Sequence, residues 1–245
     1  MYVFDLDGTL YRGSEVVPGA VETLTRLRGQ GSLVRFFTNN STLTQEQYET
    51  KLRAMGFEAH ASEVASSATG AARYLSSEYG SARFFLVGQP GLRETLTSVG
   101  HREVTAGELA QVVVCGLCRS FDYRLLDAAM QQVRGGAEFV ATNLDATFPV
   151  EGGRFQPGAG SLAAALATCT GQGPKLIGKP EPAILLDLLA ETGVPPGETL
   201  VVGDRLDTDI ECGRRAGCQV HLVLSGVAEA APPEVPSSLD LTALV

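Results

Sequence analysis

The chain of 245 residues has little positive charge and little lysine. It carries 19 basic and 28 acidic residues, a formal net charge of −9, and only three of the basic residues are lysines. This balance argues against nucleic acid or an anionic membrane surface as a partner recognised by bulk charge. No stretch approaches the ~18 apolar residues of a membrane-spanning helix, so we expect no membrane partner. A small anionic ligand is still compatible, because a few local cations can outweigh the net charge.

The five cysteines and three histidines form no disulfide framework and no zinc pattern. An odd number of cysteines in a long chain does not fit a secreted disulfide scaffold. Cys115 and Cys118 form one C-x-x-C, but no second Cys or His pair completes a zinc set, so we interpret both as buried small residues. The first residues show no basic start, long apolar segment or cleavage site of a secretory signal. We therefore expect a cytoplasmic protein with reduced thiols.

Short apolar runs alternate with amphipathic helical patterns, which is the order of βαβ units and of a parallel sheet. The composition, 44% hydrophobic and 19% charged, is that of a globular protein. Glycine-rich joints at Gly80–Ser81 and Gly171–Pro174 interrupt the alternation. We expect an α/β fold with a doubly wound, Rossmann-like parallel sheet as its core, formed by residues 1–79 and 173–245. Residues 80–172 would form an inserted α/β domain, the cap.

The first motif that carries chemistry is Asp5-Leu6-Asp7-Gly8-Thr9, directly after the first predicted strand. Two carboxylates at positions i and i+2 of a strand end can face one crevice. Two close anions need a cation, and oxygen-only ligands suit Mg²⁺. An EF-hand loop also begins D-x-D, but Leu10 and Val16 occupy its glycine and glutamate positions, which excludes it. A plain acidic turn is the alternative for this motif alone.

Two further motifs also follow predicted strands. Thr38, Asn39 and Asn40 come after the strand Leu33–Phe37 and just before a helix, where hydroxyl, amide and backbone N–H groups can hold a phosphate oxygen. The same residues are common in ordinary turns and helix caps. Lys179 stands at another strand end, where a compact ammonium could neutralise a phosphate and pair with a carboxylate. A solvated surface lysine is the alternative interpretation.

The fourth motif begins with Gly203-Asp204 after an apolar strand, and acidic residues then open a helix. A role as helix N-cap accounts for Asp207 but not for Asp204, which stands at the strand end. In doubly wound sheets the carboxyl ends of parallel strands form the crevice where ligands bind. Together the four motifs therefore predict one Mg²⁺ near Asp5, Asp7 and Asp204, with a phosphate beside it.

The motifs resemble, in order and spacing, the haloacid dehalogenase superfamily of phosphotransferases. They are most similar to the branch containing the NagD-like, 4-nitrophenyl phosphate and phosphoglycolate phosphatases. The resemblance implies a Rossmann-like core with a type-2 cap inserted between Thr38 and Lys179. It is carried by segments spread over nearly the whole chain: Asp5–Gly13 (DLDGTLYRG), Phe37–Ser41 (FTNNS), Ala141–Asp145 with Pro157–Ser161 (PGAGS), Gly178–Pro180, and Gly203–Ile210 (GDRLDTDI).

The resemblance also implies a role for each matching residue. Asp5 would be the nucleophile that becomes an aspartyl-phosphate, and Asp7 would be first the general acid and then the general base. Thr38 would bond a phosphoryl oxygen, and Lys179 would steady the nucleophile and the phosphate. Asp204 would bind Mg²⁺ together with the Asp5 carboxylate and the Asp7 backbone carbonyl.

The remaining predicted site residues lie around the phosphate and in the cap. Asp209 would contact the metal-binding groups without binding the ion itself. The family usually has Gly-Leu-Asp-Arg where this chain has Gly116-Leu117-Cys118-Arg119, and Asn-Pro-Asp where it has Asn143-Leu144-Asp145. Substrate contacts are expected in Asn143–Phe155 and around Arg119. The residues predicted to bind substrate are Thr38, Asn39, Asn40, Arg119, Asn143, Asp145 and Arg154.

We therefore expect a Mg²⁺-dependent phosphatase that hydrolyses a small phosphorylated metabolite, and 4-nitrophenyl phosphate as an artificial substrate. A phosphotransferase or mutase with the same nucleophile is an alternative. A regulatory receiver is a third, although it lacks the acid/base that Asp7 provides and has no use for an insert. Gly158-Ala159-Gly160 resembles a dinucleotide motif, but it follows an irregular stretch, Thr142–Pro157, and no strand. The physiological substrate and the oligomeric state, a homodimer included, are left open.

Overall fold

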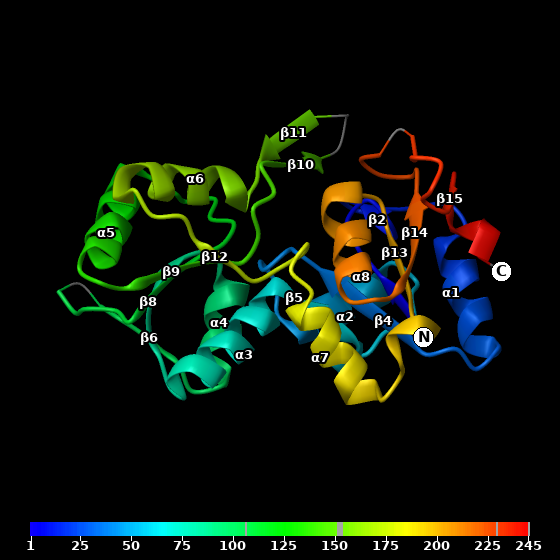
Figure 1. The fold of residues 1–245 in the computed structure, drawn as a ribbon, viewed down its shortest axis with the longest axis horizontal. Helices are drawn as coiled ribbons and strands as arrows, with labels where there is room; N and C mark the ends of the chain where they lie inside the picture. Colours follow the sequence, from blue (N-terminus) through cyan, green and yellow to red (C-terminus); the bar gives the residue numbers. More distant parts are fainter. Residues whose placement is uncertain (106, 151–153, 229, 245) are drawn as a thin grey trace.

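The computed structural model describes residues 1–105, 107–150, 154–228 and 230–244. It contains two α/β lobes that lie side by side along the longest axis of the molecule (Figure 1). The larger lobe is built on a six-stranded sheet and the smaller on a five-stranded sheet, and the strand pairs within each are parallel. The predicted α/β class with a parallel core sheet is confirmed. Within the described residues, every helix is too short or too polar to cross a membrane.

The strands of the two sheets alternate along the chain with the helices that cover them. In the larger sheet the spatial order is β15 (Ser237–Ser238), β14 (Gln219–Val223), β13 (Leu200–Gly203), β1 (Tyr2–Phe4), β4 (Val34–Thr38) and β5 (Val64–Ser66). In the smaller sheet it is β12 (Lys175–Leu176), β9 (Glu138–Ala141), β8 (Val112–Cys115), β6 (Arg83–Val87) and β7 (Arg102–Glu103).

The longer helices pack on the two sheets, and short helical turns fill the connections. The helices are α1 (Ala20–Gly29), α2 (Gln45–Ala54), α3 (Ser67–Tyr79), α4 (Pro90–Ser98), α5 (Tyr123–Arg134), α6 (Ala159–Thr170), α7 (Ala183–Thr192) and α8 (Glu211–Arg215). Thr44 begins α2 and Ser66 begins α3 with capping boxes, in which side chain and backbone satisfy each other's free groups. The short turns are Ala61–Glu63, Pro196–Glu198, Leu206–Ile210, which is π-helical, and Leu241–Leu244.

Side chains alternate between the two faces of each strand, and this alternation separates the cores. On β4, Phe36 packs with α1 and α2, whereas the next residue, Phe37, faces the opposite side. On β8, Val113 packs with α5 and α6, whereas Val112 and Val114 face α3 and α4. Each sheet is therefore covered on both faces, as parallel sheets require.

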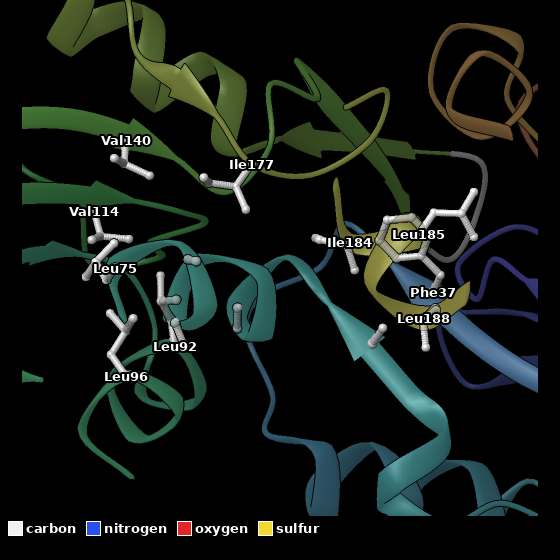
Figure 2. Close-up of a cluster of buried hydrophobic side chains, with 14 of the residues drawn as sticks. Phe37, Leu75, Leu92, Leu96, Val114, Val140, Ile177, Ile184, Leu185 and Leu188 are labelled. Carbon is white, nitrogen blue, oxygen red and sulfur yellow. The ribbon is translucent and has the colours of Figure 1, made fainter. Parts of the chain in front are cut away.

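One hydrophobic cluster is shared by the two lobes. Figure 2 shows Val114 and Val140 of the smaller sheet, Leu75 and Leu92 of α3 and α4, and Phe37 of the larger sheet as parts of this cluster. Helix α3 can approach both sheets because it is rich in small residues. A side chain at its Gly70 would overlap Ile184 of α7. The lobes are thus joined by packed side chains as well as by the chain.

The structure differs from the sequence expectations in three places. The stretch expected to be irregular contains an antiparallel hairpin, β10 (Thr147–Val150) and β11 (Arg154–Pro157). A smaller hairpin, β2 (Tyr11–Arg12) with β3 (Glu15–Val16), follows the first aspartate motif. The strand expected at Leu176–Gly178 is β12, and it pairs with β9 of the smaller sheet. The chain therefore returns to the larger lobe slightly later than the joint at 171–174 indicates.

Candidate active site

The site lies at the carboxyl edge of the larger sheet, where its central strands end. Asp5 follows β1, Thr38 is the last residue of β4 and Asp204 follows β13. These three strands are neighbours, so their polar ends are brought side by side. The backbone N–H of Asp5 donates to the carbonyl of Val202 over 2.9 Å, which extends the pairing of β1 and β13 up to the site.

Lys179 is the hub of the site. Its Nζ donates to Asp5 Oδ1 and to Asp209 Oδ1, each over 2.6 Å, and to the carbonyl of Phe37 over 3.0 Å. Burial works to lower the pKa of Lys179, but the two carboxylates outweigh it and hold the pKa above its usual value. The side chain is only 3% exposed, which excludes the solvated surface lysine considered above. All three ammonium protons are engaged, so the position of Nζ is fixed.

Three buried carboxylates cluster around this lysine. One oxygen each of Asp5, Asp204 and Asp209 lies within 4.8 Å of the others. Asp204 Oδ2 accepts from the backbone N–H of Val227 over 2.7 Å, whereas Asp204 Oδ1 is buried and has no hydrogen-bond partner. Burial raises the pKa of both Asp5 and Asp204. One lysine does not compensate three buried carboxylates, so the cluster suits an additional cation.

The surroundings of Asp204 leave no room for side chains from its neighbours. A Cβ atom at Gly8 or at Gly226 would overlap Asp204 Oδ2. Gly8 also has a φ of 98°, a conformation that residues with a side chain rarely adopt. Asp209 is placed differently, because both of its oxygens are bonded. Its Oδ1 accepts from Lys179, and its Oδ2 accepts from the backbone N–H of Arg205 over 3.0 Å.

Asp7 faces the same cavity, but its carboxylate is not part of the three-carboxylate cluster. Its Oδ2 is buried without a hydrogen-bond partner. Burial raises the pKa of Asp7, and the ammonium of Lys51 opposes that effect. A carboxyl group in this environment holds a proton at higher pH than an exposed aspartate does.

Most polar side-chain groups of the loop after β4 form hydrogen bonds to neighbouring residues of the site. Asn39 Oδ1 accepts from the backbone N–H of Lys179 over 2.7 Å, and Asn39 Nδ2 donates to the Lys179 carbonyl over 3.1 Å. Asn40 Oδ1 accepts from the backbone and the hydroxyl of Thr42. Thr38 Oγ1 accepts from the N–H of Asn40 over 3.1 Å, which leaves its hydroxyl proton free to donate.

The smaller lobe contributes two residues that reach this loop. Asn143 is buried, and its Nδ2 donates to the Asn39 carbonyl over 2.8 Å. Its Oδ1 accepts from the N–H of Asp145 over 3.1 Å and so directs Asp145 toward the cavity. Asp145 Oδ2 in turn accepts from Asn39 Nδ2 over 3.3 Å. Burial raises the pKa of Asp145, and the positive charge of Arg205 opposes this.

The two arginines expected to bind substrate are placed differently. Arg119 lines the cavity, where Nη1 donates to Gln156 Oε1 over 3.0 Å and the guanidinium lies 5.7 Å from the centroid of the Phe148 ring. Arg154 is exposed on β11 and is not among the residues that line the cavity. The structure therefore does not bring Arg154 to the site. Residues 151–153 of the expected substrate-contact stretch lie outside the described residues.

The cavity between the lobes has a volume of about 340 Å³ and is lined by all the other predicted site residues. Sequence reasoning missed two cations in its lining, Lys51 and Arg205. Lys51 lies on α2, with Nζ 3.8 Å from the centroid of the Tyr11 ring. Lysine is scarce in this chain, with only three residues, and that scarcity could have pointed to Lys51 as a site residue. Arg205 directly follows Asp204 in the fourth motif, so its position in the sequence could have pointed to it as well.

Comparison with known proteins identifies the family. Residues 2–102 match the model of haloacid dehalogenase-like hydrolases, and residues 176–240 match a second model described as HAD-hydrolase-like. An acid sugar phosphatase of Staphylococcus aureus is 38% identical over 227 residues, which are 93% of this chain and 87% of the relative.

Solved structures agree with these matches. The 4-nitrophenylphosphatase of Thermotoga maritima superposes with a TM-score of 0.91 at 34% identity, covering 99% of this chain and 95% of that one. A glycerol phosphate phosphatase of Mycobacterium tuberculosis, solved in complex with magnesium, has a TM-score of 0.90 at 37% identity, covering 99% of this chain and 75% of that one. The chain belongs to the haloacid dehalogenase-like hydrolases. Within them it is a phosphoric monoester hydrolase of the NagD-like branch, as its motifs indicate.

Proposed function

We propose that this phosphatase uses Mg²⁺ to hydrolyse a small organic phosphomonoester through an aspartyl-phosphate on Asp5. The observation that supports this proposal most strongly is the set of hydrogen bonds around Lys179. They fix Asp5 beside Asp204, whose carboxylate has one buried oxygen without a hydrogen-bond partner. A fixed carboxylate nucleophile, a buried cation and an uncompensated carboxylate in one cavity are the groups that phosphoryl transfer to an aspartate needs.

The donor set fits magnesium, which prefers oxygen ligands in a compact arrangement. We propose that the carboxylates of Asp5 and Asp204 and the backbone carbonyl of Asp7 hold the ion. When bound, Mg²⁺ would offset the charge that builds up on the phosphoryl oxygens. Asp209 keeps Lys179 in place rather than binding the ion, because both of its oxygens already accept hydrogen bonds. The magnesium and calcium complexes of the mycobacterial relative support a divalent cation as the ligand of such a site.

Chelation provides the direct test of the proposed metal. Excess EDTA should abolish hydrolysis of 4-nitrophenyl phosphate, and added Mg²⁺ should restore it. Ca²⁺ should not restore activity, because it prefers more ligands and a looser geometry. Steady-state release of 4-nitrophenolate measures all three conditions. Full activity in excess chelator would contradict the metal role of Asp204.

The other side chains of the site bind the phosphate and position the nucleophile. A bare carboxylate is repelled by a phosphate dianion, and the ammonium of Lys179 offsets that repulsion at Asp5. Thr38 has a free hydroxyl proton with which to bind a phosphoryl oxygen. We assign Asn39 to positioning, since its amide holds the backbone of Lys179. Asn40 stands beside it at the cavity wall.

Asp7 is proposed as the general acid toward the leaving oxygen and then as the base for the attacking water. Burial raises its pKa, which favours a protonated carboxyl group that can donate. Asp7→Asn should lower kcat for 4-nitrophenyl phosphate by about 10²–10⁴-fold, the usual contribution of general acid–base catalysis. The loss should be larger for an alkyl phosphate, because its leaving group needs a proton more than 4-nitrophenolate does. A loss below about tenfold for both esters would assign the proton transfer to another group.

We further propose that residues 80–172 act as a substrate-selecting cap on a catalytic core of residues 1–79 and 173–245, with β12 completing the sheet of the cap. Asp145 and Arg119 reach the cavity from the cap, whereas the proposed nucleophile and metal ligands all come from the core. The names of the relatives, for acid sugar phosphate, glycerol phosphate and 4-nitrophenyl phosphate, support a small phosphorylated metabolite as the substrate. The free cysteines support a reducing cytoplasm as the location.

A further inference from the structure

A buried hydrogen bond joins the smaller lobe to Asn39, the residue whose amide holds Lys179. Asn143 lies just after β9, and its Nδ2 donates to the backbone carbonyl of Asn39 over 2.8 Å. Both residues are buried. The same carbonyl accepts from Oγ of Ser67, the first residue of α3, over 2.5 Å. The Asn39 backbone is therefore held by one residue of the proposed cap and by one of the proposed core.

The side chain of Asn39 continues this contact to Lys179. Its Oδ1 accepts from the Lys179 N–H over 2.7 Å, and its Nδ2 donates to the Lys179 carbonyl over 3.1 Å. One amide thus binds both backbone polar groups of the lysine. A side chain at Gly178 would overlap Asn39 Oδ1, so the two segments lie in direct contact. A displacement of Asn39 would consequently displace the backbone from which Lys179 Nζ reaches Asp5.

The amide of Asn143 is bonded to the protein at both ends. Its Nδ2 donates to Asn39, and its Oδ1 accepts from the backbone N–H of Asp145 over 3.1 Å. A buried amide with both ends bonded fixes the segments that it joins, because leaving either group unpaired would cost free energy. Although the sequence suggested that Asn143 contacts substrate, its bonds are those of a residue that holds other residues in place.

We propose that Asn143 is a positioning residue for phosphoryl transfer: through Asn39 it holds the backbone of Lys179, and so the ammonium beside Asp5. The inference rests on the proposed function, because it takes Asp5 as the nucleophile and Lys179 as the group that offsets its charge. The smaller lobe then does more than select the substrate, since Asn143 supports a step that is common to all substrates. A small displacement of a reacting group can lower a rate by about 100-fold.

The kinetics of Asn143→Ala with two unlike esters test the proposal. 4-nitrophenyl phosphate and glycerol 1-phosphate share the phosphoryl group but differ in the leaving group. We expect kcat to fall by about 10–100-fold for both esters, by similar factors and with KM nearly unchanged. Asp145→Ala should instead affect the two esters unequally, because Asp145 reaches the cavity from the proposed cap. A loss confined to one ester, or expressed mainly in KM, would overturn the proposal.

A second variant separates the two bonds of Asn143. Asn143→Asp keeps the oxygen that accepts from Asp145 but has no N–H for the Asn39 carbonyl. It should therefore show the same loss of kcat as Asn143→Ala. Activity close to that of the wild type in Asn143→Asp would mean that Asn143 acts through Asp145 and would contradict the proposed route through Asn39.

A double-mutant cycle shows whether the effect passes through Asn39. Asn39→Ala removes the amide that binds the backbone of Lys179. In that background Asn143→Ala should lower kcat by no more than about a further twofold, because residues that act through one another are not additive. Independent losses that multiply would show that Asn143 acts by another route, which would overturn the proposal.

Thr142→Val is the matched control. The Thr142 hydroxyl is buried next to Asn143 and shares a hydrogen bond with Ser41 Oγ over 3.2 Å, a second contact between the lobes. Removing this hydroxyl should leave kcat within about twofold of the wild type, because its bond does not include Asn39 or Lys179. A loss as large as that of Asn143→Ala would show that any weakened contact between the lobes lowers the rate, and the specific role of Asn143 would be wrong.

The backbone amide resonance of Lys179 in isotope-labelled protein provides a measurement that needs no turnover. Asn143→Ala should move the proton resonance upfield, because the bond to Asn39 Oδ1 weakens, and Thr142→Val should leave it in place. An unchanged resonance in Asn143→Ala would overturn the proposal. Failure of the wild-type protein to hydrolyse 4-nitrophenyl phosphate with Mg²⁺ would instead refute the proposed function, and the resonance would still decide whether Asn143 positions Lys179.

Discussion

Asp5→Asn should abolish phosphatase activity and leave the fold intact. An amide oxygen is a poor nucleophile and a weak magnesium ligand, so the variant loses both functions proposed for Asp5. We expect kcat for 4-nitrophenyl phosphate to fall by at least about 10⁴-fold, in line with the removal of other enzymic nucleophiles. Lys179 keeps Asp209 as a partner, so no buried charge is left alone.

Circular dichroism and thermal unfolding should show a folded protein, and the rate should be measured at matched Mg²⁺. Asp127→Asn is the control, because Asp127 is an exposed aspartate on α5 that does not line the cavity. It should behave as the wild-type enzyme does. Near-normal turnover by Asp5→Asn would mean that another group attacks phosphorus and that the mechanism proposed above is wrong.

Lys179→Met should combine loss of activity with loss of stability. The substitution leaves Asp5 and Asp209 buried together with no cation between them. Breaking a buried ion pair by removing one partner typically costs about 3–5 kcal/mol of the free energy of unfolding. Activity should also fall by about 10³-fold or more, because an uncompensated carboxylate must then approach a phosphate dianion.

Urea unfolding in the presence of a chelator measures the stability of this variant without compensation from a metal ion. Kinetics at a temperature where the variant is fully folded measure the catalytic loss separately. Lys175→Met should change neither quantity by much, since that lysine is exposed. A stable but inactive Lys179→Met would show that Asp5 and Asp209 find another way to relieve their repulsion. A stable and active variant would contradict the role of Lys179 as the hub.

The core of the site could be predicted because each residue follows a strand in the sequence. Asp5, Thr38 and Asp204 are all set by the same local pattern, an apolar run that ends in a polar residue. Their gathering needs only the general rule that parallel strands end at one edge. Lys179 reaches the same edge by another route, because the strand before it pairs with β9 in the other sheet. Which sheet a two-residue strand joins depends on distant contacts that a sequence pattern does not contain.

The site residues that come from the smaller lobe could not be predicted in the same way. Each strand of the hairpin β10–β11 contains a proline, Pro149 or Pro157, and prolines are uncommon inside strands, so the sequence did not predict two strands here. Arg154 was therefore expected in the cavity but lies exposed on β11. Lys51 is the reverse case, because it lines the cavity but was not predicted to do so. The helical pattern of α2 was evident, but whether its lysine faces water or a buried aspartate depends on the packing of α2 against Tyr11.

The hydrophobic cluster shared by the lobes has a consequence for how the protein folds and evolves. Helix α3 packs against strands of both sheets, so neither lobe can complete its core before the other is at least partly formed. The two halves of the larger sheet are also separated by the whole insert along the chain, and they must meet before β1 has both of its neighbours. We therefore expect the two lobes to unfold together in one cooperative transition, not as two independent domains. Evolution could change the loops and the hairpin over the cavity freely, but loss of the smaller lobe would expose Leu75 of α3, which lies beside Val114 of the smaller sheet (Figure 2), to water.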